Sequence, residues 1–112
     1  MKKLFIILLL CTFALASPTQ HQVALTWTQS TGAGITGNCV YRSQTSGGSY
    51  TQLWCSLSPA TTYVDSTVVG GQTYYFVVTA AAGTQESAFS NEVKTVIPQS
   101  PTSPLGLSAT VQ

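Results

Sequence analysis

The sequence predicts an all-β fold, an antiparallel sandwich of two packed sheets. Beyond residue 16, helical periodicity is absent, and short runs rich in β-branched and aromatic residues alternate with clusters of Gly, Ser and Pro. Six such runs follow one another at close spacing, with no helical segment between them. Parallel strands need long crossover connections, usually helices, so this pattern favours antiparallel strands packed as a sandwich.

The first run, residues 23–27, alternates so that three apolar side chains share one face, as a half-buried strand requires: Val23, Leu25 and Trp27. Residues 38–43 and 50–55 form the next two runs and are separated by the segment QTSGGS. We expect these two runs to form a hairpin, with Gly47 and Gly48 supplying the positive φ values of its turn.

The other three runs are residues 61–65, 73–82 and 87–97, and the last one stops at Pro98. In the long run 73–82, alternate residues form an apolar face that we expect to point into the core. The predicted core residues are therefore Trp27, Tyr74, Phe76 and Val78.

Residues 1–16 have the layout of a secretory signal peptide. Lys2 and Lys3 precede an apolar run, and Ala14-Leu15-Ala16 provides a small-residue cleavage site before Ser17. We therefore expect a secreted protein, extracellular or at the cell surface, with the periplasm also open.

Two other interpretations of this segment stay open. An uncleaved anchor would need roughly 20 apolar residues, and the apolar stretch here is shorter. Lipid attachment at Cys11 is the second interpretation, but the processing of lipoproteins looks for a small residue before the cysteine, and Leu10 stands there. With cleavage, no membrane span remains.

The predicted mature chain is almost neutral. It has two basic and three acidic residues and a net charge of −1: Arg42, Lys94, Asp65, Glu86 and Glu92. A chain with so few charges has no electrostatic footprint for nucleic acid or for anionic lipid. Nucleic acid is therefore excluded as a partner.

Two of the three cysteines remain after cleavage, and an even count in an exported chain predicts a disulfide between Cys39 and Cys55. A turn centred near Gly47 places them opposite each other, closing a loop of about 15 residues. A register slip of one residue would send the two thiols to opposite faces of the hairpin.

Five segments, taken in order and at their spacing, resemble a fibronectin type III domain of the kind common in bacterial exported proteins: VALTW (23–27), VYRSQTSGGSYTQL (40–53), TTYVD (61–65), GQTYYFVVTAAA (71–82) and ESAFSNEV (86–93). The resemblance covers residues 22–98 and implies an immunoglobulin-like sandwich. It implies that Trp27 is the core tryptophan of strand B. It also implies that the Tyr74 hydroxyl bonds to the backbone at the corner between strands E and F.

The sequence departs from the family pattern in two places. Asn38 stands where strand C usually has an aromatic residue, which we expect to thin the core. Strand A is missing at the N-terminus, yet a segment of strand A type follows the domain. The predicted organisation is a signal peptide (1–16), a fibronectin type III-like domain (17–98), a Pro/Ser linker (99–104) and a strand A-like tail (105–112).

Three interpretations of the tail remain open. It is a remnant of a longer array or an unstructured tail; it is a strand donated to the open edge of strand B in a second copy; or it completes its own domain. The last requires a linker of eight residues, spanning at most about 26–29 Å, to cross the sandwich. Donation between copies would create a homo-polymer through residues 105–112.

No set of residues supports catalysis, a cofactor or a metal. Residues 32–37 match G-x-G-x-x-G, but no helix or suitably spaced acidic residue follows, as dinucleotide binding would require. His21 is the one histidine, and we expect it in solvent before the first strand. Asp65 and Glu86 are expected in turns and loops rather than as an acid pair.

Alternation leaves some aromatic residues outside the core, and Tyr41, Tyr75 and Tyr50 form the candidate binding surface. Scattered surface aromatics without a ligand are the alternative. The sequence therefore predicts a secreted or cell-surface, non-catalytic interaction module that binds a protein or a carbohydrate, as in adhesion. The alternative function is a structural subunit that assembles head to tail by donating its C-terminal strand.

Overall fold

The computed structural model describes residues 20–112, which contain seven strands and no helix. The strands are β1 (Val23–Thr26), β2 (Gly37–Ser43), β3 (Thr51–Cys55), β4 (Thr62–Asp65), β5 (Thr73–Ala82), β6 (Gln85–Glu86) and β7 (Val93–Val96). The predicted all-β antiparallel fold is confirmed. The predicted signal peptide, residues 1–16, lies outside the described residues.

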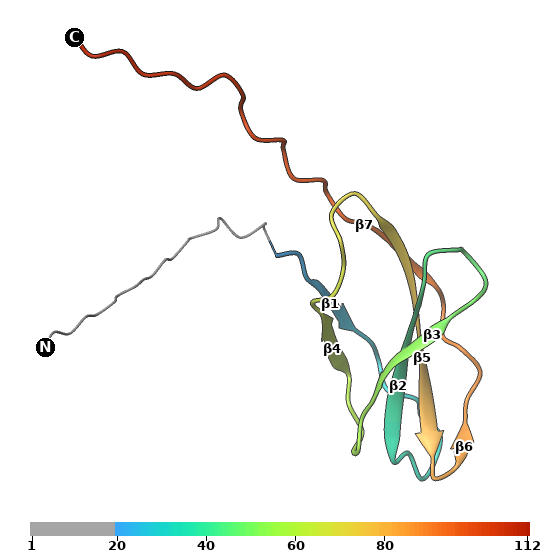
Figure 1. Cartoon of the computed structure of the whole chain (residues 1–112). Helices are drawn as coiled ribbons and strands as arrows, with labels where there is room; N and C mark the ends of the chain where they lie inside the picture. Colours follow the sequence, from blue (N-terminus) through green and yellow to red (C-terminus); the bar gives the residue numbers. More distant parts are fainter. Residues whose placement is uncertain (1–19) are drawn as a thin grey trace, which may run out of the picture.

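The strands form two antiparallel sheets (Figure 1). The smaller sheet pairs β1 with β4, and the larger one has the order β3-β2-β5, with β6 and β7 both paired to the far edge of β5. Within residues 20–112 no strand precedes β1, and β4 is its one partner. One edge of β1 is therefore open, as the missing strand A predicted.

The core lies between the two sheets and consists of seven buried apolar side chains: Val23, Leu25, Val40, Val68, Tyr74, Phe76 and Ile97. Of the predicted core residues, Tyr74 and Phe76 are 4% and 1% exposed. Trp27 and Val78 are partly buried and pack against the cluster from its border. The alternation in β1 and β5 thus points the expected residues inward.

The β2–β3 hairpin carries the predicted disulfide between Cys39 and Cys55, which the structure confirms with a Cα–Cα distance of 4.1 Å. The turn differs from the prediction, because positive φ occurs at Gly47 and Ser49 rather than at Gly47 and Gly48. A bulge at Leu53 shifts the register between the turn and the disulfide. Without this extra residue, the pairing next to the turn would not bring the cysteines opposite each other.

The prediction of one strand over residues 87–97 is wrong, because the chain leaves the sheet between β6 and β7. The amides of Ala80 and Val78 in β5 donate to the hydroxyls of Ser87 and Ser90, at 2.9 Å each. Two side chains thus replace backbone acceptors of the ladder. The intervening chain is released from the strand, and Phe89 projects from this segment.

Residues 98–112 contain no strand and extend away from the sandwich beyond β7 (Figure 1). They leave at the pole where β1 begins. Pro98, at the start of this segment, and His21, just before β1, both lie against Gly70: a Cβ on Gly70 would be 3.0 Å from the Pro98 carbonyl oxygen and 3.2 Å from His21 Nε2. In the single chain, the tail does not complete its own domain at β1. Within residues 20–112, no helix has the length and apolar character needed to cross a bilayer.

A candidate strand-binding cleft

The open edge of β1 presents backbone groups that no strand within residues 20–112 pairs. The Trp27 amide donates to the Thr61 carbonyl, toward β4, at 3.0 Å. Residues of an antiparallel strand alternate between those that bond to one neighbour and those whose N–H and C=O groups point the other way. Ala24 and Thr26 therefore present these groups to the open edge. Both residues are exposed, and no strand in the described range pairs with this side.

A cleft of about 390 Å³ lies beside this edge. Residues 25–30 form one wall, and the connection between β6 and β7 forms the other. The inward side chains of Phe76, Val78 and Ala80 line it between the walls. The cleft thus separates the open edge of the small sheet from the free edge of the large one, where an added strand would close the sandwich.

Trp27 lines this cleft and carries an unsatisfied polar atom. Its indole Nε1 is buried and has no acceptor among the described residues. A buried donor without a partner costs about 1–3 kcal/mol. Among the described residues, this side of the cleft therefore has both backbone groups and a side-chain donor without hydrogen-bond partners.

Asn38 lies at the cleft wall, where the family pattern has an aromatic residue. It is 2% exposed. Its amide nitrogen donates to Gln29 Oε1 at 2.9 Å and to the Thr79 carbonyl at 3.2 Å, and its Oδ1 accepts from Gln29 Nε2 at 2.8 Å and the Ala60 amide at 3.0 Å. A saturated polar network replaces the aromatic residue of the family. Gln29 lies in a loop and had no sequence signal.

The C-terminal segment, residues 103–111, has the pattern of a strand with one apolar face. Every second residue is apolar (Leu105, Leu107, Ala109 and Val111), and the residues between them are Gly, Ser and Thr. Leu105, Leu107 and Val111 are 94%, 97% and 97% exposed. An apolar stripe of this kind gains from burial in a cleft and has none in the single chain.

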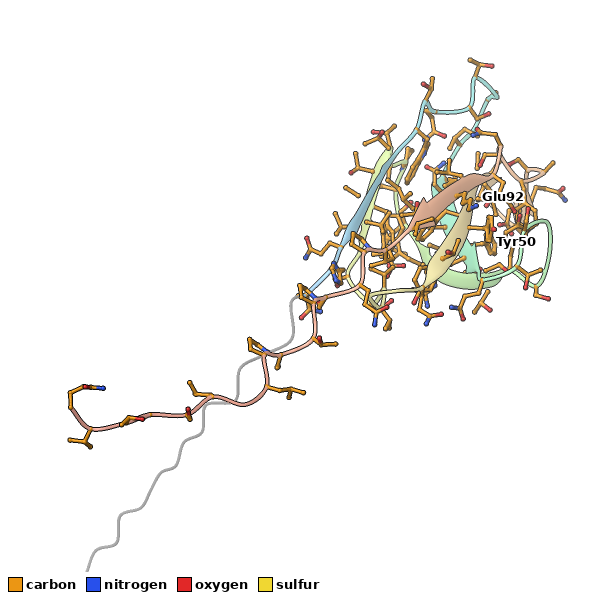
Figure 2. The ribbon with its side chains drawn as sticks, turned by 90° about the horizontal axis from the view of Figure 1, so that it is seen from above. Tyr50 and Glu92 are labelled. Carbon is orange, nitrogen blue, oxygen red and sulfur yellow. A yellow bond between two sulfur atoms is a disulfide. The ribbon has the colours of Figure 1, made fainter. Side chains whose placement is uncertain are left out.

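The predicted aromatic surface is rearranged on the outer face of the larger sheet. Phe89 contacts Tyr41 and Tyr50 edge to face, with ring centroids 5.2 and 5.1 Å apart. The Tyr41 hydroxyl donates to Glu86 and the Tyr50 hydroxyl to Glu92, toward which Tyr50 points in Figure 2. These hydrogen bonds to carboxylates raise the pKa of both tyrosines. The pKa of Glu86 is lowered by hydrogen bonds from Thr79 and Tyr41, and the pKa of Glu92 is lowered first by the hydrogen bond from Tyr50.

The aromatic rings of this cluster contact one another, and two of its hydroxyl groups bind glutamates of the same chain. Val77, which lies opposite Tyr41 on the same outer face, is 2% exposed. Tyr75 makes no ring contact with the cluster and lies opposite Ser43 and Lys94. The surface of Tyr41, Tyr75 and Tyr50 is thus not one continuous platform, and its ligand stays a prediction.

An ion pair between a partly exposed arginine and a buried carboxylate joins the two sheets at the pole where β1 begins. Arg42 Nη1 donates to Asp65 Oδ2 at 2.8 Å, and Asp65 is 1% exposed. The guanidinium lies 4.7 Å from the centroid of the Tyr74 ring. The Tyr74 hydroxyl accepts from the Val69 amide at 3.1 Å, the hydroxyl-to-backbone bond that the resemblance implies. Asp65 is therefore a strand residue with a partner rather than a turn residue.

This ion pair predicts a loss of stability in acid. Burial alone raises the pKa of Asp65, but hydrogen bonds from Thr67 and the ion pair with Arg42 outweigh it, so the pKa lies below its ordinary value. The stabilisation is present above the unfolded pKa of about 4 and is lost as pH falls through the lower folded pKa. Urea unfolding at pH 6 and pH 3 measures this loss.

The matched control for that measurement is Asp65→Asn, which removes the titrating group. We expect its stability to vary less over the same pH range, with Glu86 and Glu92 supplying the remaining dependence, since their pKa values are also lowered. An equal dependence in the variant and the natural protein would contradict the assignment to Asp65.

The described residues bring no catalytic set together. No group of three or more His, Cys, Asp or Glu side chains within residues 20–112 could hold a metal ion. Asp65 and Glu86 belong to different sheets. The expectation that His21 lies in solvent is wrong, because His21 is half-buried beside Gly70 and its Nε2 is covered. The loop 32–37 leads into β2 and not into a helix.

Comparison with known proteins places this fold among characterised domains. No protein-family model matches the sequence, and no curated protein matches it. An Fn3-like protein from Clostridium thermocellum is 32% identical, with a TM-score of 0.60, over 72% of this chain and 81% of that one. A fourth FNIII domain from human (18% identity, TM-score 0.63, 78% and 74% covered) and the twitchin kinase region from C. elegans (20%, 0.61, 71% and 14%) share the fold.

The match at 32% identity covers most of both chains, and it agrees with the two-sheet topology and the bond from the Tyr74 hydroxyl. Domains of this fold are typically non-catalytic modules. The chain belongs to the fibronectin type III family.

Proposed function

We propose that this protein is an exported interaction module that assembles by strand exchange. The C-terminal segment of one copy lies along the open edge of β1 in another copy and fills the cleft beside it. The observation that carries this proposal is the cleft itself, which combines edge groups of β1 and the buried indole Nε1 of Trp27, none of which has a partner among residues 20–112. The predicted signal peptide and the disulfide, a bond that persists in oxidising compartments, support export.

The tail is the occupant that the chemistry of this site favours. Strand addition needs an extended segment with free backbone groups and side chains that match the groove in alternation. Residues 103–111 have this alternation, and their apolar residues are exposed. Figure 2 shows the tail extending clear of the sandwich.

A second copy is favoured over the same copy as the acceptor. The tail leaves at the pole where β1 begins, whereas an antiparallel partner of β1 must start at the opposite pole, beside Trp27. The linker 97–104 would then have to cross the whole sandwich before pairing could start, and it would have to be almost fully extended.

Two pairs of tail substitutions test this proposal by size-exclusion chromatography over a range of protein concentrations. Leu105→Asp with Leu107→Asp places charge on the apolar face, and we expect this variant to be monomeric because a buried, unpaired carboxylate is strongly disfavoured. Ser108→Asp with Thr110→Asp adds the same charge to the other face and is expected to assemble like the natural protein.

The proposal requires concentration-dependent oligomers of the natural protein. If the natural protein and both variants elute as the same monomer at high concentration, strand exchange is wrong. If both variants assemble like the natural protein, the apolar face of the tail is not the contact.

A further inference from the structure

We infer that the donated segment runs antiparallel to β1, with Ser108 opposite Thr26 and Leu107 opposite Trp27, so that Leu105 and Leu107 enter the cleft. This inference rests on the strand exchange proposed above. It adds the direction and the register of the contact, and both can be tested separately from whether the copies assemble.

The direction follows from where the cleft lies along β1. The cleft borders residues 25–30, at the end of β1 and beyond it, and not the beginning of the strand. The large side chains of the tail, Leu105 and Leu107, are at its N-terminal end, and Ala109 follows them. An antiparallel strand puts the leucines beside the cleft, whereas a parallel strand would put them beside Val23 and Leu25.

The two faces of β1 decide whether the odd-numbered or the even-numbered residues of the tail point into the cleft. Ala24 and Thr26 present their N–H and C=O groups to the donor and their side chains to solvent. Residues directly opposite each other on antiparallel strands have their side chains on the same face. The donor residues opposite them must therefore come from the polar set of the tail: Gly106, Ser108 and Thr110.

Within that parity, the proposed register is the one in which all four apolar residues of the tail lie opposite residues 23–29, in β1 or beside the cleft. With Ser108 opposite Thr26, the inward residues Trp27, Leu25 and Val23 lie opposite Leu107, Ala109 and Val111, respectively. Leu105 then lies opposite Gln29, which also lines the cleft. A shift by two residues in one direction carries Val111 past Val23, and in the other direction carries Leu107 past Trp27.

This arrangement also sets how copies follow one another. The tail leaves its own copy at the pole where β1 begins and enters the next copy at the opposite pole. The two contact surfaces are different, so the contact is heterologous and repeats in one direction. The linker PQSPTSP, with prolines at 98, 101 and 104, is a semi-rigid spacer between successive copies.

Disulfide trapping between two differently labelled full-length proteins tests the register. Both carry Cys11→Ser, so that each has one added free thiol. ¹⁵N-labelled Thr26→Cys is mixed with unlabelled Ser108→Cys in a glutathione buffer, and the linked peptides are identified by mass spectrometry. We expect about fivefold more heterodimer from this pair than from Thr26→Cys with Thr110→Cys, because a disulfide needs Cα atoms about 4.4–6.8 Å apart.

Each outcome bears on a different claim. More product with Thr110→Cys or Gly106→Cys than with Ser108→Cys overturns the register and leaves strand exchange in place. The same holds if no pair forms a heterodimer while size-exclusion chromatography shows assembly. A double variant, Thr26→Cys with Ser108→Cys, that bridges only within one chain would show that the tail fills its own domain and would overturn the proposed exchange.

Discussion

Replacing Asn38 by Leu is expected to lower the free energy of unfolding by about 3 kcal/mol, because several buried polar groups lose their partners. Leu has a similar size but forms none of the four side-chain hydrogen bonds of Asn38. The Ala60 amide and the Thr79 carbonyl would lose these bonds at a nearly closed site. Urea unfolding followed by fluorescence measures the change, and the melting temperature should fall by roughly 15 °C.

The control is Gln29→Ala, which removes one partner and leaves the bonds of Asn38 to Ala60 and Thr79 intact. We expect a loss of about 1 kcal/mol for this variant. The effects of the two substitutions should not add in the double variant, since they share one network. A stability of Asn38→Leu equal to that of the natural protein would show that an apolar residue serves this position equally well.

Removal of the disulfide by Cys39→Ala with Cys55→Ser is expected to lower the free energy of unfolding by about 3 kcal/mol, on the chain-entropy estimate for a loop of about 15 residues. The two cysteines are 16 residues apart in sequence. Ala suits position 39, where the side chain is 6% exposed, and Ser suits the exposed position 55.

Denaturant unfolding should also show a larger m-value for this variant, because the unfolded chain without the cross-link exposes more surface. The natural protein unfolded in the presence of a reductant provides the chemical control, and it should match the variant. Equal stability of the reduced and oxidised proteins would contradict a structural role for the bond.

The strands that could be predicted are those whose face is set by alternation alone. In β1 and β5, apolar residues recur at every second position, and burial of one face follows directly from strand geometry. The pairing of Cys39 with Cys55 was predicted from a turn centred near Gly47. The structure reaches the same pair through a different turn and a bulge at Leu53.

The split between β6 and β7 could not be predicted, because it depends on Ser87 and Ser90 meeting the amides of Ala80 and Val78. The sequence ESAFSNEV is compatible with a continuous strand. The position of Phe89 between Tyr41 and Tyr50 follows from this departure from the sheet.

Some features of the candidate site could likewise be predicted from the sequence, and others could not. A missing first strand and a spare strand-like tail were visible in the sequence, since both depend on the order of segments. The cleft, the Asn38 network and the unpartnered indole of Trp27 were not visible. Each of these joins residues from distant segments, such as Gln29 and Ala60 around Asn38.

The alternation and the order of the segments were enough to predict the fold class, the cysteine pair and the open edge of β1, because both patterns act along the chain. The polar partners of Asn38 and the pairing of Asp65 with Arg42 emerge only in the folded chain. The same holds for the aromatic cluster, whose rings contact one another, and for the cleft that borders β1. Hydrogen bonds and burial depend on which distant backbone and side-chain groups come together, and alternation does not encode these contacts.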